Sequence, residues 1–254
     1  RKIKEYYVKN KKVTELNSKL RDVHLNIKIK KKKKRYDDKI VLDVENIDIK
    51  SNNIYAVVGM NGSGKSTLIN GMAGVEEFSE CSITYDGKQF EEVKDNISLM
   101  LQNFYIFNDT VRNNILLPVK YSKKKIDFQK NLEKYMKFFN LEPLLDKNAR
   151  KLSGGEKTKT ALLRALIRNT DLVILDEPTN NMDVDGIKAV EELIMYLKEE
   201  GKTVILITHN IMQVERTADY VLFIDKGRVV ECVERKNIKN IFDNLSLKEI
   251  LKVL

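Results

Sequence analysis

A glycine-rich stretch carries residue types that bind a phosphate chain. Residues 59–67 read Gly-Met-Asn-Gly-Ser-Gly-Lys-Ser-Thr and fit the P-loop pattern. Glycines let backbone N–H groups turn toward phosphate oxygens that a Cβ would obstruct. We expect Lys65 to reach the β- and γ-phosphates and the Ser66 hydroxyl to ligate Mg²⁺. The stretch predicts nucleotide binding through these contact residues: Gly59, Asn61, Gly62, Ser63, Gly64, Lys65, Ser66 and Thr67.

The segments on either side of this loop are those that the pattern requires. The apolar run 54–58 indicates a buried strand before the loop. Residues 66–73 indicate a short helix that ends at Gly74. The N-terminus of that helix would add a partial positive charge beneath the phosphates. Because strand, loop and helix occur together, a chance glycine-rich turn is a poor alternative explanation.

A second apolar strand, over residues 172–175, ends in the carboxylates of Asp176 and Glu177. Asp176 is placed to hold Mg²⁺, directly or through water, which leaves Glu177 free to orient and deprotonate an attacking water. A strand that ends in Asp-Glu is common by itself. Behind a P-loop, it predicts nucleotide hydrolysis.

Other elements must position these groups. Strands that alternate with helices after residue 172 indicate a parallel sheet, whose ligands bind at the carboxyl ends of its strands. Alternating apolar residues over 23–29, with further strands over 40–49 and 82–85, predict an antiparallel layer. Helical spacing over 127–140, and from Ser153 to about 169, predicts a helical lobe at about 105–168.

We therefore expect an α/β fold with a P-loop NTPase core and a mainly parallel sheet, an antiparallel β-subdomain and an inserted helical subdomain. The predicted organisation has three parts. They are a basic lead-in or linker at 1–22, a nucleotide-binding domain at 23–232 and a C-terminal helical tail at 233–254.

The composition is that of a globular protein with 42% hydrophobic and 33% charged residues. No apolar run approaches the roughly 20 residues that span a bilayer, and no secretory signal pattern opens the chain. Cys81 and Cys232 lie far apart and in no metal-ligand spacing, which favours free thiols in a reducing compartment.

The positive charge is concentrated at the start of the chain. Residues 1–40 hold 16 of the 46 Lys and Arg residues but only 5 of the 37 Asp and Glu residues. The run Lys30–Arg35 has two interpretations: a solvated strand end or loop, or a contact with nucleic acid or anionic lipid. We favour the first, because charge runs usually form solvated faces.

Several ordered motifs resemble the ATP-binding-cassette (ABC) ATPases over about residues 23–232. Leu-Ser-Gly-Gly-Glu at 152–156 resembles the family's signature motif, and we call residues 153–155 the signature turn. Residues 180–183 occupy the position of the family's D-loop. His209 matches the switch histidine and Gln102 the Q-loop glutamine.

The resemblance implies that two such domains close head to tail around two ATP molecules. The P-loop of one domain and the signature turn of the other would then hold each ATP. In addition to the P-loop, the implied ATP contacts are Tyr36, Ser153, Gly154, Gly155 and Asp183, with Tyr36 stacked on adenine. The implied catalytic residues are Glu177, His209 and Gln102, and the implied Mg²⁺ ligands are Ser66, Gln102 and Asp176.

The resemblance also implies partners and a location. They are a second nucleotide-binding domain, identical or different, and the transmembrane domains of a transporter, at the cytoplasmic face of the membrane. The stretch Phe104–Ile115 resembles exporters, whereas 152–156 and 176–179 resemble importers and stand-alone subunits. We therefore expect ATP-driven transport, with export favoured and an importer subunit or a soluble ATPase acting on ribosomes or nucleic acid as alternatives. We do not expect nucleic acid as a partner.

Overall fold

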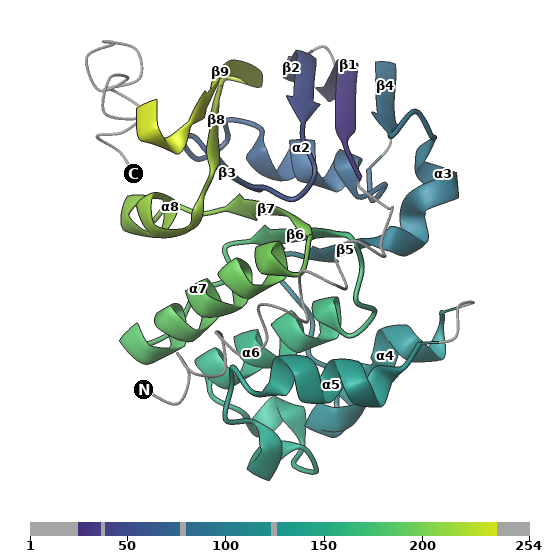
Figure 1. Ribbon diagram of the computed structural model, residues 1–254, viewed down its shortest axis with the longest axis vertical. Coiled ribbons are helices and arrows are strands. Elements are labelled where there is room, and N and C mark those ends of the chain that lie inside the picture. The colour runs from purple at the N-terminus through teal and green to yellow at the C-terminus, as the bar shows by residue number, and fades with distance from the viewer. Residues whose placement is uncertain (1–24, 37–38, 77–79, 123–125, 238–254) are drawn as a thin grey trace.

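The computed structural model describes residues 25–36, 39–76, 80–122 and 126–237. The predicted lead-in and most of the predicted C-terminal tail lie outside these residues. Within them, a small antiparallel sheet lies at one end of the molecule and a group of helices at the other, with a six-stranded sheet between them (Figure 1). No helix in the described ranges is long and apolar enough to cross a membrane.

The central sheet has the strand order β5-β6-β7-β3-β8-β9 and is parallel except for the pairing of β8 with β9. Every residue of β3, β6 and β7 is buried, as expected for parallel strands covered on both faces. The strands are β3 (Ile54–Val58), β5 (Ile97–Met100), β6 (Leu172–Asp176), β7 (Thr203–Ile207), β8 (Tyr220–Asp225) and β9 (Arg228–Glu234).

The second sheet has the order β2-β1-β4, with both pairings antiparallel. Its strands are β1 (Ile27–Tyr36), β2 (Lys39–Ile49) and β4 (Glu80–Tyr85). Apolar side chains from this sheet share one core with the central sheet and with α2 (Lys65–Met72). This core fixes α2, and the loop before it, between the two sheets. The mainly parallel sheet and the antiparallel β-subdomain confirm the predicted fold class.

The lysine run belongs to a strand, whereas the sequence predicted a strand that ended at residue 29 and left the run as a strand end or loop. β1 continues through the run to Tyr36. The β1–β2 register places Lys28 opposite Asp48 and Lys33 opposite Asp43. Lys33 Nζ lies 3.8 Å from Asp43 Oδ2. Opposite charges on facing strands stabilise the pairing, which explains how a lysine-rich strand forms here.

The other α-helices within the described residues are α3 (Phe90–Val93), α4 (Val111–Lys120), α5 (Phe128–Met136), α6 (Gly154–Leu166), α7 (Val184–Glu199) and α8 (Ile211–Thr217). Helices α4, α5 and α6 make up the helical subdomain, and their apolar faces share a core with α7 and the central sheet. Ser153 caps α6 through a reciprocal pair of hydrogen bonds with Glu156.

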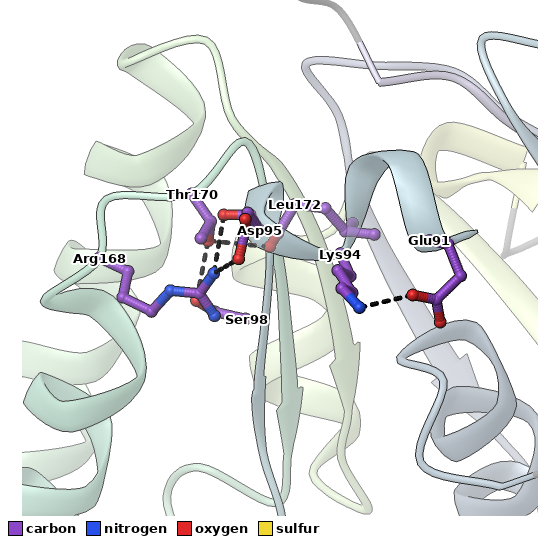
Figure 2. A network of polar contacts seen from close by, with 7 residues as sticks. All are labelled: Glu91, Lys94, Asp95, Ser98, Arg168, Thr170 and Leu172. Carbon is purple, nitrogen blue, oxygen red and sulfur yellow. Dashed lines mark hydrogen bonds and ion pairs between the residues drawn. The ribbon is translucent and has the colours of Figure 1, made fainter. Parts of the chain in front are cut away.

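Polar contacts fasten β5 to β6 (Figure 2). Arg168, just after α6, donates to the carbonyl and the carboxylate of Asp95 at 2.9 and 3.0 Å. Thr170 donates to Ser98 of β5 at 2.9 Å, and both side chains are buried. These bonds hold β5 and β6 in register, so the residues that follow them have fixed positions.

Candidate nucleotide site

The glycine-rich loop turns sharply between β3 and α2. Gly62 and Gly64 have φ angles of +76° and +104°, where a Cβ would be strained. A Cβ on Gly59 would lie 2.1 Å from the carbonyl oxygen of Ile224, so the loop packs directly against β8. The turn leaves the first N–H groups of α2 available to an anionic ligand.

Lys65 folds back over this loop. Its Nζ donates to the carbonyl oxygens of Gly59 at 2.7 Å and Met60 at 2.9 Å. Burial lowers the pKa of Lys65, and the nearby carboxylates of Glu177 and Asp176 partly oppose that effect. The ammonium group thus lies where phosphate oxygens could replace the two carbonyls as its partners.

Ser66 and Asp176 form a pair of oxygen ligands. The Ser66 hydroxyl donates to Oδ2 of Asp176 at 3.4 Å, and the backbone N–H of Gln102 donates to the same carboxylate. Asp176 is 4% exposed, and burial raises the pKa of its carboxyl. Hydroxyl and carboxylate oxygens are the ligands that Mg²⁺ prefers, so these residues fit the predicted ion.

Glu177 is held in a buried and strained position. Its side chain is 7% exposed, and burial raises the pKa of the carboxyl to about 7. The backbone N–H of His209 donates to this carboxylate, and His209 Nε2 lies 3.1 Å from Oε1. Its φ of +49° is rare for a residue with a Cβ and is typical of functional sites. A base with a pKa near neutrality is suited to accept a proton from water.

These groups line one pocket of about 190 Å³ at the carboxyl ends of the parallel strands. Gln102 follows β5, Asp176 ends β6 and His209 follows β7. The lining residues are Val41, Asn61, Gly62, Gly64, Lys65, Ser66, Thr67, Gln102, Asp176, Glu177, Ile207 and His209. Sequence reasoning missed Val41 and Ile207, because a strand aliphatic carries no motif of its own.

Outside the signature turn, the predicted ATP contacts Gly59, Ser63 and Asp183 do not line this pocket. Asp183 caps α7, where its side chain accepts from the backbone N–H of Gly186 at 2.8 Å. Tyr36 ends β1, and its side chain lies outside the described part of the structure.

The signature turn also lies outside the pocket of its own P-loop. Ser153 and Gly154 are exposed at the N-terminus of α6, and the Ser153 hydroxyl accepts from the backbone N–H of Glu156 at 3.3 Å. The exposed end of a 13-residue helix attracts anions. This turn therefore does not contribute to the phosphate pocket of the same chain.

A family model, curated proteins and solved structures that resemble this chain all point to the same family. Residues 42–180 match the family model described as ABC transporter. The chain is 34% identical over 209 residues to the tungstate uptake system ATP-binding protein TupC of Peptoclostridium acidaminophilum, covering 82% of this chain and 98% of that protein.

Two further similarities differ in how much of the other protein they cover. The ATP-dependent lipid A-core flippase of Vibrio parahaemolyticus is 32% identical, over 76% of this chain but only 35% of the flippase. The solved structure of cbiO1 from Clostridium perfringens, part of the ABC transporter complex cbiONQ, superposes with a TM-score of 0.73 at 26% identity. That superposition covers 91% of this chain and all of cbiO1.

Proposed function

This chain belongs to the ABC transporter family as an ATP-binding ATPase domain, and from that premise we propose how its residues hydrolyse ATP and drive transport. The observation that carries the proposal is the position of the Glu177 carboxylate. It is buried beside the P-loop, with His209 within 3.1 Å and the Ser66–Asp176 pair on the same pocket wall.

In this mechanism the P-loop backbone and Lys65 bind the phosphates of ATP. Ser66, Asp176 and Gln102 would hold Mg²⁺, and a bound Mg²⁺ would neutralise negative charge on the phosphates. Glu177 takes a proton from the attacking water, while His209 orients the Glu177 carboxylate and contacts the γ-phosphate. The water oxygen bonds to phosphorus as the bond to ADP breaks.

A second domain completes the site. Ser153, Gly154 and Gly155 do not line the pocket of their own chain, and in this proposal they bind the γ-phosphate held by the P-loop of the partner domain. Asp183 caps α7 within its own chain. From its position at the end of the D-loop, it would also contact the partner domain. The functional unit is then a head-to-tail dimer with two ATP molecules at its interface.

The transmembrane partner docks beside the residues that follow Gln102. Tyr105 and Phe107 are 59% and 42% exposed and meet edge to face at 4.9 Å. Arg150 donates to the Tyr105 hydroxyl at 3.0 Å, and a second pocket lies between Phe104–Ile106 and the start of α6. Exposed aromatic rings beside a pocket suit a docked helix, which would place the domain at the cytoplasmic face of a membrane.

The direction of transport follows from the partner rather than from this site. We retain export as the working direction, because Phe104–Ile115 resembles the exporter form. Import is the alternative, because the uptake protein TupC matches over nearly its whole length.

The proposal is tested with purified protein. The chain should release phosphate from ATP only when Mg²⁺ is present. A Glu177→Gln variant should bind ATP, lose most turnover and shift to a dimer in light scattering when ATP is added. A variant that hydrolyses ATP at the parent rate would refute the role of Glu177, and one that stays monomeric with bound ATP would refute the head-to-tail dimer.

A further inference from the structure

Two buried threonines on α6 differ in one contact. Thr158 and Thr160 are 1% and 0% exposed. Each hydroxyl donates to the carbonyl four residues earlier, Thr158 to Gly154 at 3.1 Å and Thr160 to Glu156 at 2.8 Å. The Thr158 hydroxyl also lies 3.3 Å from the carbonyl oxygen of Asn180. Because a hydroxyl has one proton, Thr158 shares it between the start of α6 and the D-loop.

Asn180, the D-loop residue in this contact, is connected to Glu177 through the backbone. The backbone N–H of Asn180 donates to the carbonyl of Glu177 at 3.2 Å. Glu177 and Asn181 both have left-handed φ angles, +49° and +61°, so the segment between them is tightly wound. A movement of the Asn180 carbonyl therefore changes the backbone angles that aim the Glu177 carboxylate.

The signature turn packs on the same loop. A Cβ on Gly154 would lie 3.3 Å from Asn181 Cβ, and one on Gly155 would lie 3.3 Å from the Asn181 carbonyl oxygen. Close packing of this kind transmits small displacements, because neither side has space to absorb them. The signature turn, the D-loop and Glu177 thus form one continuous set of contacts within a single chain.

We propose that Thr158 is a positioning residue that couples the signature turn to Glu177 of the same chain. The inference rests on the proposed function, in which the signature turn binds the ATP held by the partner domain. When that γ-phosphate engages the turn, the Thr158 hydroxyl carries the displacement to Asn180 and thereby to Glu177. Occupation of one ATP site then sets the geometry of the base in the other.

The test removes the hydroxyl while keeping its shape. Thr158→Val lacks the donor, Thr158→Ser keeps it, and Thr160→Val is the matched control, since Thr160 has the same helix, burial and local bond without the D-loop contact. ATP hydrolysis is measured against ATP concentration. We expect Thr158→Val to lower kcat about tenfold, the equivalent of one neutral hydrogen bond, with KM nearly unchanged. Its Hill coefficient should fall toward 1, whereas Thr158→Ser and Thr160→Val should resemble the parent.

The possible outcomes distinguish a failure of the Thr158 coupling from a failure of the proposed function. If Thr158→Val and Thr160→Val behave alike while Glu177→Gln still dimerises with ATP, the coupling is wrong and the proposed function stands. If Glu177→Gln does not dimerise, the proposed function fails first. Should Thr158→Val not fold, Thr158→Ala removes the same hydroxyl from a smaller side chain, and parent-like kcat and Hill coefficient in that variant would overturn the proposal.

Discussion

Oε1 of Glu177 lies 3.1 Å from Nε2 of His209, so the residues that follow β6 and β7 meet at the site of the proposed reaction. Burial raises the pKa of Glu177 to about 7 and lowers that of His209. The two pKa shifts have opposite directions, but both favour the neutral form of the side chain. Near pH 7 a small change in pH therefore decides whether Glu177 can accept a proton.

The pH dependence of hydrolysis should follow this carboxyl. A raised pKa means that Glu177 holds a proton below about pH 7 and can act as a base only above it. We expect kcat/KM for ATP to rise through this pH, because kcat/KM reports the pKa values of the free enzyme. Binding of a non-hydrolysable ATP analogue, measured over the same range, controls for effects on affinity. A kcat/KM that stays flat between about pH 6 and 8 would contradict the assignment.

The free energy of unfolding should also depend on pH through the Glu177 carboxyl. Between 4.5, the ordinary pKa of Glu, and about 7, the folded state binds a proton that the unfolded state has released. The contribution of neutral Glu177 to the free energy of unfolding is therefore fully present below pH 4.5 and is lost as the pH rises through about 7. Glu177→Gln does not ionise, so its Tm should exceed that of the parent at pH 8 and match it at pH 4.

The full pKa shift from 4.5 to about 7 sets an upper limit of about 3 kcal/mol on this difference, at about 1.4 kcal/mol per pKa unit. Each kcal/mol corresponds to roughly 2–4 °C in Tm for a domain of this size. Thermal denaturation without nucleotide, at both pH values, measures it. A lower Tm for Glu177→Gln at pH 8 would mean that the carboxylate is stabilising rather than strained.

Lys65 should dominate the affinity for ATP. Its ammonium lies over the P-loop on the carbonyls of Gly59 and Met60, and a phosphate would replace them with charge-assisted hydrogen bonds. Such a bond contributes about 1.5–3 kcal/mol, so Lys65→Ala should weaken ATP binding by roughly 10- to 100-fold in calorimetry. Lys130→Ala, which changes an exposed lysine on α5, is the control. Equal affinities for both variants would exclude Lys65 as a phosphate ligand.

The sequence could predict the site best where the chemistry restricts residue type. The P-loop needs glycines at positive φ, and Asp176 and Glu177 end a strand of four apolar residues, so their places at the sheet edge follow from local pattern. The strained φ of Glu177 and its contact with His209 depend on how β6 and β7 pair. No local pattern carries that information.

The features that could not be predicted from the sequence depend on contacts between distant segments of the chain. The sequence of residues 30–35 favours the interpretation of a solvated lysine run, yet these residues belong to β1, where Lys33 lies opposite Asp43 of β2. Val41 lines the pocket only because β2 packs near the P-loop. Asp183 matched a motif for ATP contact, but within the chain its carboxylate caps α7.

The paired lysines lead to a last prediction, on nucleic acid. Lys33 lies 3.8 Å from Asp43, Lys34 lies 3.5 Å from Glu76, and Lys28 faces Asp48 across the β1–β2 register. Acidic neighbours reduce the attraction of this strand for phosphate backbones, because binding would have to displace them. ATP hydrolysis by the full chain should therefore not be stimulated by RNA or DNA. Stimulation that disappears between about 50 and 200 mM salt would identify a nucleic-acid ATPase instead, since counterion release makes such binding steeply salt-dependent.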